Sequence, residues 1–94
     1  MNALVSIITP SYNSAKFIAE TIQSVQNQTY SNWEMIIVDD GSSDETESVV
    51  LNIIQKDNRI QFHKLSQNSG PAVARNTGIE KASGDYMTLI DADD

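Results

Sequence analysis

The stretch WEMIIVDDGSSDE, residues 33–45, contains the transitions that decide the fold. Its first half is an apolar, partly β-branched run, short enough for a buried strand. Two acids, Asp39 and Asp40, end that run, and a glycine follows. Ser42 and Glu45 then match the capping-box pattern that opens a helix. We therefore expect a strand-to-helix junction with two carboxylates at the strand end.

Upstream of this junction, the chain repeats the same order of elements. Residues 4–9, LVSIIT, form a short apolar run that predicts another buried strand. From Asn13 the pattern becomes helical, and Asn13 or Ser14 is a candidate N-cap. The apolar positions of this expected helix share one face: Ala15, Ile18, Ile22 and Val25.

Downstream, the alternation continues to the end of the chain. The second helix is expected to bury Val49, Val50, Ile53 and Ile54. Residues 60–65 alternate apolar and polar, as a half-exposed strand does. Pro71 suits the first turn of a third helix, which we expect to run to about Ala82. Residues 85–90, DYMTLI, read as a fourth strand that is apolar enough to be buried.

This order of elements indicates an α/β domain. Strands that alternate with helices pair in parallel through crossover connections. In such sheets, ligands bind outside the carboxyl ends of the strands. The segments that fall at that edge are TPSYN, DDGSSD and DADD, at residues 9–13, 39–44 and 91–94.

Composition limits the other possibilities. With 94 residues the chain has room for one small domain. Its net charge is -7 and it has no basic stripe, so nucleic acid is not expected as a partner. The chain has no cysteine, its first residues do not resemble a signal peptide, and it has no apolar run long enough to span a bilayer. We expect a cytoplasmic location, with association at the inner face of the membrane left open for the full-length protein.

The carboxylates at the end of the chain predict a metal site. Asp91 and Asp93 are separated by one residue, and Asp94 follows. Hard carboxylate oxygens suit Mg²⁺ or Mn²⁺, and Mg²⁺ lets substrate phosphates complete its shell. An isolated pair of this kind is usually a solvated acidic loop. Here Asp39 and Asp40 lie on the same expected edge, which favours a functional interpretation.

Taken together, these motifs resemble family 2 glycosyltransferases. The resemblance rests on VSIITPSYN (5–13), NQTY (27–30), the 33–46 stretch, NSGPAVARNTGIEKASGDY (68–86) and LIDADD (89–94), in order and at the usual spacings. It implies the GT-A fold, a Rossmann-like nucleotide-binding arrangement. With the edge-like pattern of residues 60–65, it predicts a parallel sheet in the order 3-2-1-4. It further implies transfer of a sugar from a nucleotide-diphosphate sugar to an acceptor hydroxyl, usually with inversion and with a divalent cation, Mn²⁺ or Mg²⁺.

The resemblance also assigns roles to individual residues. Pro10 and Tyr12 would line the base pocket, and Asp40 would accept a hydrogen bond from a pyrimidine base, leaving Asp39 as a structural acid. The turn that contains Gly70 would close over the nucleotide. The DxD motif maps onto Asp91, on the ribose or metal side, and Asp93, the main metal ligand.

The roles of three further residues are less closely defined by the resemblance. Asp94 is a further candidate at the metal site. Arg75 either pairs with an acid of the DxD loop or forms a surface salt bridge. Gly78 is expected to allow close packing of the third helix.

In the family, the general base and the acceptor-binding residues lie downstream of the DxD motif, that is, beyond Asp94. We therefore expect residues 1–94 to be the N-terminal nucleotide-sugar-binding portion of a longer enzyme. Such a portion would bind nucleotide without turning it over, and an exposed sheet edge could support a homo-oligomer. The acceptor stays unknown, with a saccharide or a lipid-linked saccharide as options.

Other classes fit the pattern less well. A receiver-like phosphorylation domain would need an acceptor aspartate after the third strand, and HKLSQN (63–68) contains none. A phosphatase with an aspartyl nucleophile can carry DxD after its first strand, whereas this motif follows the fourth. A non-catalytic α/β module that binds nucleotide, metal or a protein partner is the alternative left open.

Overall fold

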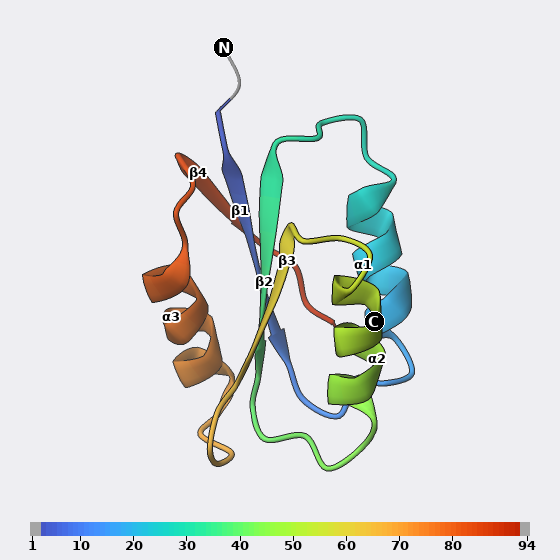
Figure 1. Cartoon of the computed structure of the whole chain (residues 1–94). Helices are drawn as coiled ribbons and strands as arrows, with labels where there is room; N and C mark the ends of the chain where they lie inside the picture. Colours follow the sequence, from blue (N-terminus) through green and yellow to red (C-terminus); the bar gives the residue numbers. More distant parts are fainter. Residues whose placement is uncertain (1–2, 93–94) are drawn as a thin grey trace.

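Strands and helices alternate strictly in the computed structural model of the chain, which describes residues 3–92 (Figure 1). The seven elements are β1 (Val5–Ser11), α1 (Ile18–Gln26), β2 (Trp33–Asp39), α2 (Thr46–Ile54), β3 (Ile60–Lys64), α3 (Pro71–Lys81) and β4 (Tyr86–Leu89). Each expected strand and helix is present, and the bounds shift by only a few residues.

The four strands form one sheet in the order β3-β2-β1-β4, and every pairing in it is parallel. The predicted α/β fold and strand order are therefore confirmed. Because β1 pairs in parallel with β2 on one side and β4 on the other, the carboxyl ends of these three strands lie side by side at the same edge. The segments that follow them carry the predicted site.

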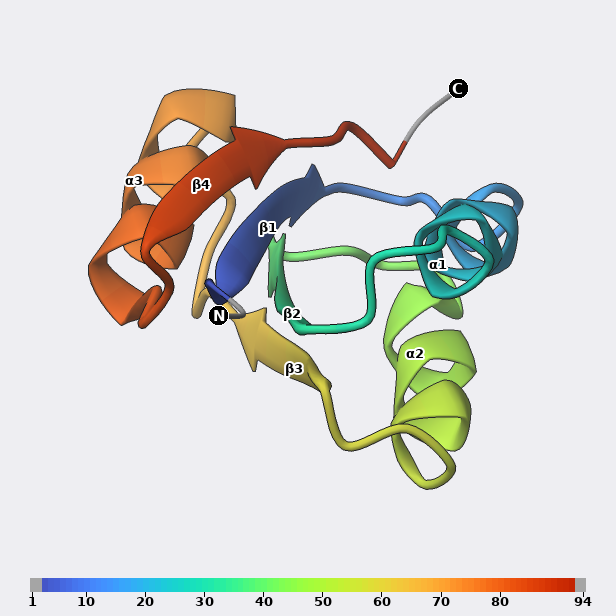
Figure 2. The same ribbon diagram turned by 90° about the horizontal axis from the view of Figure 1, so that it is seen from above.

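Helices cover both faces of the sheet, α3 on one and α1 with α2 on the other (Figure 2). Two apolar clusters result. The larger lies under α1 and α2 and includes Ile7, Ile22, Met35 and Val50. The smaller lies under α3 and consists of Ile8, Ile36, Val38 and Ala74.

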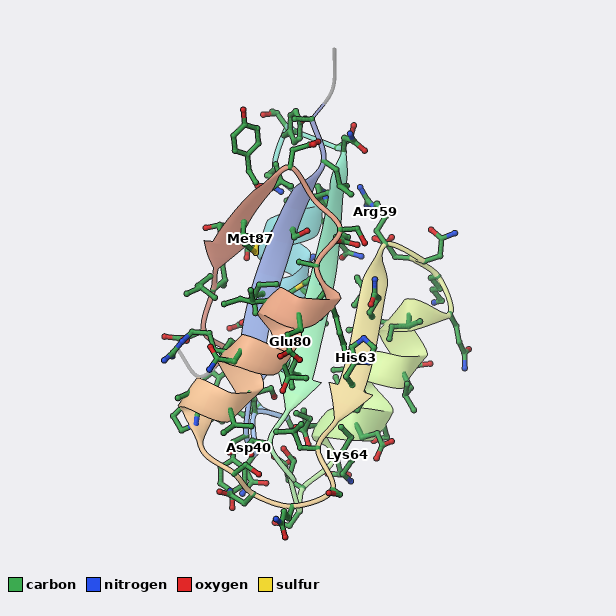
Figure 3. The ribbon with its side chains drawn as sticks, turned by 90° about the vertical axis from the view of Figure 1, so that its left-hand side faces the viewer. Asp40, Arg59, His63, Lys64, Glu80 and Met87 are labelled. Carbon is green, nitrogen blue, oxygen red and sulfur yellow. The ribbon has the colours of Figure 1, made fainter. Side chains whose placement is uncertain are left out.

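Gly78 explains how α3 packs so close to the sheet, as the sequence predicted. A Cβ added at this position would lie 2.5 Å from Cγ2 of Ile8 and 3.4 Å from Cγ2 of Val38. Only a glycine therefore fits between the helix and the strands. The contact positions the N-terminal end of α3 over the carboxyl ends of β1 and β2 (Figure 3).

The expectation that the fourth strand is buried is wrong. All four residues of β4 are exposed, and Tyr86, Met87 and Leu89 are 66%, 55% and 52% exposed. The reason is topological, because β4 is an edge strand that pairs only with β1 in the described part of the chain. Figure 3 shows Met87 on this open edge.

The two predicted helix caps are also wrong. Helix α1 begins at Ile18 with Phe17 as its N-cap residue, and no side chain caps it. Asn13 adopts a positive φ of 51° and its Oδ1 accepts hydrogen bonds from the backbone N–H groups of Ser43 and Asp44, at 2.8 and 3.3 Å. Its side chain is thus committed to the loop after β2.

The capping box at the start of α2 does not form for a similar reason. Glu45 is the N-cap residue and makes no side-chain cap hydrogen bond. Ser42 instead donates its hydroxyl to Asp39. The acid that serves the helix start is Asp44, whose Oδ1 accepts a hydrogen bond from the backbone N–H of Thr46 at 3.0 Å.

The second helix is less buried than its apolar pattern predicted. Val50 is fully buried, whereas Val49, Ile53 and Ile54 are partly buried and pack against the larger cluster. Helix α2 lies towards the β3 edge of the sheet, so part of its apolar face stays open to solvent (Figure 2).

At the amino end of the sheet, an arginine stacks on the tryptophan that begins β2. Arg59 lies 3.8 Å from the ring centroid of Trp33, and its guanidinium forms an ion pair with Asp57 at 2.9 Å. This hydrogen-bonded arginine lowers the pKa of Asp57 to about 2. The cluster closes the amino end of the sheet, away from the predicted site.

Candidate nucleotide-sugar site

A pocket of about 390 Å³ opens at the carboxyl ends of β1, β2 and β4. Its lining includes five residues that the sequence analysis singled out: Pro10, Tyr12, Asp40, Gly70 and Asp91. Segments that lie up to 81 residues apart in the chain are therefore brought to one place. The roles predicted for these residues within the pocket stay predictions.

The two acids that end β2 have different surroundings. Asp39 is fully buried, and its carboxylate accepts hydrogen bonds from the backbone N–H and the hydroxyl of Ser42. It therefore holds the loop that leads to α2, as expected of a structural acid. Asp40 is 5% exposed and lines the pocket.

Asp40 also positions the turn before α3. Its Oδ1 accepts a hydrogen bond from the backbone N–H of Ser69 at 2.7 Å, and its Oδ2 accepts one from that of Gly70 at 2.9 Å. Gly70 has a φ of 100°, a conformation that favours glycine. Each carboxylate oxygen keeps a second lone pair, so Asp40 can still accept a bond from a ligand.

A second glycine lets this turn approach the end of β2. Gly41 has a φ of 81°, and a Cβ there would lie 3.2 Å from the backbone nitrogen of Asn68. Asn68 lines the pocket together with Gly70 and Pro71. The turn of residues 67–70 is thereby held against the β2 end by Gly41 and Asp40 together.

The loop after β1 is anchored from the α2 side. The backbone N–H of Asn13 donates to the Ser42 hydroxyl at 2.7 Å, and that of Ser14 donates to Oγ1 of Thr46 at 2.9 Å. Between these anchored residues and the strand, Tyr12 is 50% exposed and lines the pocket. An exposed aromatic ring beside a buried acid can stack on a planar ligand while the acid binds its polar edge.

Asp91 lies on the β4 side of the pocket, with Arg75 from α3 among the other lining residues. Within residues 3–92, Arg75 makes no ion pair, so neither of the two pairings considered for it is seen there. Asp93 and Asp94 lie outside the described residues. Among the described ones, no cluster of three or more His, Cys, Asp or Glu side chains could hold a metal.

Several residues of the pocket lining carry no individual signal in the sequence that marks them as site residues. Ser11 and Ala74 line the pocket but were not singled out, and Ser14, considered only as a helix cap, lines it too. Ala74 appears on the sequence as an ordinary helix position, and nothing in its pattern marks it. Ser11 lies inside the TPSYN stretch, whose position after the first strand was the available signal.

Comparison with known proteins identifies the family of this chain. The model of glycosyl transferase family 2 matches residues 6–94. The chain belongs to this family. It is a member of a class of glycosyltransferases, and the predicted family resemblance is confirmed.

Individual relatives agree with this assignment. The chain is 48% identical over 91 residues to a putative teichuronic acid biosynthesis glycosyltransferase, TuaG, of Bacillus subtilis, covering 97% of this chain and 36% of TuaG. It is 46% identical over 91 residues to the UDP-Glc:alpha-D-GlcNAc-diphosphoundecaprenol beta-1,3-glucosyltransferase WfgD of Escherichia coli, covering 97% of this chain and 35% of WfgD.

A solved structure shows the same architecture. The mannosyltransferase PcManGT from Pyrobaculum calidifontis, in complex with GDP-Man and Mn²⁺, superposes with a TM-score of 0.91 at 29% identity. The match covers 99% of this chain and 28% of PcManGT. The chain thus spans about a third of the length of the curated relatives it matches.

Proposed function

We propose that this chain carries the donor-binding part of an inverting, metal-dependent glycosyltransferase. It binds a nucleotide-diphosphate sugar at the carboxyl edge of its sheet. The observation that carries the proposal is the pocket that gathers Pro10, Tyr12, Asp40, Gly70 and Asp91 from four separate segments. Nucleotides bind at this edge of open α/β sheets in general.

Each wall of the pocket suits a different part of the donor. The exposed Tyr12 ring supplies a stacking surface for the base, and Pro10 adds an apolar wall. Asp40 accepts from the base through the lone pairs that the turn leaves free. Gly70 brings the turn over the nucleotide, and Asp91 faces the ribose and diphosphate side.

Asp91 and Asp93 are the proposed ligands of a divalent cation, Mn²⁺ or Mg²⁺. Carboxylate oxygens fit such hard cations, and one or two of them suffice when substrate phosphates complete the shell. A bound cation would neutralise charge on the diphosphate as it leaves. Within the described residues only Asp91 of this pair is placed, at the pocket.

We further propose that residues 1–94 are the N-terminal portion of the enzyme domain, with the general base and the acceptor-binding half beyond Asp94. Support comes from the length of the relatives, of which this chain covers about a third. The chain alone would therefore bind nucleotide without transferring sugar. WfgD takes a lipid-linked saccharide according to its name, so a saccharide or a lipid-linked saccharide is the proposed acceptor class.

Location and assembly follow as parts of the same proposal. A lipid-linked acceptor would bring the full-length protein to the inner face of the membrane from a cytoplasmic location. No helix within residues 3–92 is long and apolar enough to cross a bilayer. The open edge of β4, with its exposed Tyr86, Met87 and Leu89, is a surface through which chains could pair as a homo-oligomer.

Calorimetric titration tests the proposal directly. UDP, GDP and ADP are titrated into the chain in the presence and absence of Mn²⁺. Selective binding of one nucleoside diphosphate, weakened at least tenfold by Asp91→Asn in the presence of Mn²⁺, is the expected result. Glu80→Gln removes the same charge from an exposed position on α3 and should leave affinity unchanged (Figure 3). Absence of binding to all three nucleotides would contradict the proposal and favour a non-catalytic module.

A further inference from the structure

We propose that Glu34 is a positioning residue, which fixes the register of β4 and so places Asp91 at the pocket. This inference rests on the proposed function, in which Asp91 serves the metal and diphosphate side of the donor. Glu34 lies in β2 at the amino end of the sheet and is not among the described residues that line the pocket. Its effect on binding is therefore transmitted through β4 and not through contact with a ligand.

The side chains of β4 do not fix the register of this strand themselves. All four of its residues are exposed, and within residues 3–92 the strand pairs only with β1. A strand that buries neither face loses little when it slips along its neighbour, so its register is weakly specified. Beyond the strand, Ala92 belongs to the larger apolar cluster and Ile90 packs against it. Strand β4 is thus held at its ends and not along its length.

Two side chains from the central strands hold the link of residues 82–85 between α3 and β4, at the amino end of the sheet (Figure 1). Oε2 of Glu34 accepts hydrogen bonds from the backbone N–H of Ser83 and from the Ser6 hydroxyl, both at 2.6 Å. Oγ of Ser6 accepts in turn from the backbone N–H of Gly84 at 2.8 Å. Hydrogen bonds to an ionised carboxylate are about twice as strong as neutral ones. Glu34 and Ser6, which are paired across β2 and β1, thus bind two successive N–H groups of the link.

Gly84 makes this anchor specific for one register. A Cβ added at Gly84 would lie 2.5 Å from Oγ of Ser6 and 2.8 Å from the backbone oxygen of Leu4. The neighbours of Gly84 in the chain are Ser83 and Asp85. A slip by one residue in either direction would therefore bring a side chain into a space that only glycine fits.

The register that is set at this end determines which residue reaches the pocket at the other end. Strand β4 runs from Tyr86, opposite Val5, to Leu89, opposite Ile8, and Asp91 follows at the pocket. A slip by one residue moves the strand by about 3.3 Å and turns each side chain to the other face of the sheet. Such a slip would take Asp91 out of the pocket and leave the side built by β2 and the turn before α3 in place.

Calorimetric titration of the best-bound of UDP, GDP and ADP, with and without Mn²⁺, measures this role. The factor by which Mn²⁺ raises nucleotide affinity should fall about 3- to 10-fold in Glu34→Ala. Affinity without Mn²⁺ should change by less than about twofold, because Asp40 keeps its place. Glu34→Gln retains an oxygen that can accept both hydrogen bonds, so it should retain most of the Mn²⁺ effect.

Asp57→Asn is the matched control for a loss of stability. It removes an acid from the same end of the sheet, one that bonds to Arg59 and Gln26 and not to the link before β4. This variant should keep the whole Mn²⁺ effect. A loss of the Mn²⁺ effect in Asp57→Asn as large as that in Glu34→Ala would assign both losses to general destabilisation and overturn the proposal.

A double-mutant cycle shows whether Glu34 acts through Asp91. In an Asp91→Asn background, Glu34→Ala should reduce the Mn²⁺ effect no further, because the group that Glu34 positions is already lost. Equal reductions in the wild-type and Asp91→Asn backgrounds would show that Glu34 acts independently of Asp91, and would refute the positioning role.

Amide hydrogen exchange of the ligand-free chain tests the anchor without a nucleotide. The backbone N–H of Ile90 donates to the carbonyl of Ile8 at 3.0 Å, just after β4. In Glu34→Ala this N–H should exchange about 3- to 10-fold faster, because the edge strand opens locally. The N–H of Asp40, which donates to the carbonyl of Ser11 at 2.8 Å, should change no more than it does in Asp57→Asn.

These measurements separate the inference from the function on which it rests. If Glu34→Ala leaves either the Mn²⁺ effect or the exchange of Ile90 unchanged, the positioning role is refuted while the donor site stands. If the wild type binds no nucleotide, or binds it equally with and without Mn²⁺, the proposed function fails and the effect of Glu34 on binding fails with it. Ser6→Ala, which removes the hydroxyl bonded to Gly84, takes the place of Glu34→Ala if thermal melts show that variant to be unfolded, with the same expected results.

Discussion

The Oδ2 atom of Asp40 accepts a hydrogen bond from the backbone N–H of Gly70 at 2.9 Å, which ties the end of β2 to the residue before α3. Its other oxygen accepts from Ser69. One carboxylate thus holds the turn that lines the pocket and is also proposed to accept a hydrogen bond from the base.

Replacing this acid should therefore affect both stability and binding. In Asp40→Asn the amide nitrogen cannot accept a hydrogen bond, so one backbone N–H of the turn loses its partner. We expect a loss of about 1–3 kcal/mol in the free energy of unfolding, measured by urea denaturation. Nucleotide affinity should fall about tenfold with or without Mn²⁺. An unchanged unfolding free energy would contradict the role assigned to the two hydrogen bonds.

A second prediction concerns the order in which metal and nucleotide bind. Mn²⁺ and Mg²⁺ retain several waters unless phosphates replace them, so we expect negligible metal binding by the chain alone. A nucleoside diphosphate should raise metal affinity, and the metal should raise nucleotide affinity by the same factor. Asp93→Asn should remove most of this coupling. Calorimetric titrations of Mn²⁺ and nucleotide, separately and together, measure it, and equal nucleotide affinity with and without Mn²⁺ would refute it.

A third prediction tests the close approach of α3 to the sheet. In an exposed helix interior, Gly→Ala stabilises by about 0.5–1 kcal/mol. Gly78→Ala should instead destabilise by about 1–3 kcal/mol, because the new methyl group would overlap Ile8. Asn76→Ala, at an exposed position of the same helix, serves as the control. Urea denaturation gives the sign, and a stabilised Gly78→Ala variant would show that the helix can move away.

A fourth prediction concerns acid stability. The Arg59 side chain holds the pKa of Asp57 at about 2, below the ordinary 3.8. A lowered carboxyl pKa contributes stability above pH 3.8 that is lost as the pH falls through about 2. Because Arg59 is 36% exposed, solvent screening reduces this contribution to about 1 kcal/mol.

Asp57→Asn should therefore lower the free energy of unfolding at pH 7 by about 1 kcal/mol and have little effect near pH 2. Urea denaturation of both proteins across this range provides the measurement. Glu80→Gln, an exposed change of equal charge, should shift neither value. A deficit of the same size at pH 2 and pH 7 would assign the effect to packing rather than charge.

The sequence predicted the fold well because periodicity and order of elements are local signals. Apolar runs such as LVSIIT and the helical spacing of Ile18, Ile22 and Val25 each depend on a few neighbours, and their alternation determines a parallel sheet. Burial of β4 was mispredicted because its apolar residues lie at an edge, and edge position depends on the whole sheet.

Details of the site were harder to predict, because they depend on contacts across the chain. Asn13 resembles an N-cap, yet it bonds to residues 30 positions later in the loop after β2. The unpaired hydroxyl of Ser11 could not be predicted at all, since it is a property of every neighbour that fails to reach it. The acids were found because their placement after strands is visible in the sequence.

The pairing of β1 with β4 has a consequence for how the molecule folds. Paired residues of β1 and β4 lie 81 positions apart in the sequence, as Ile8 and Leu89 do. Paired residues of β1 and β2 lie only about 28 positions apart. Closing the longer loop costs more chain entropy, and distant pairings slow folding. The side of the pocket built by β1 and β2 can therefore form first, and Asp91 arrives with the last strand to dock. The ability to bind nucleotide should therefore appear late in folding, after most of the backbone has become ordered.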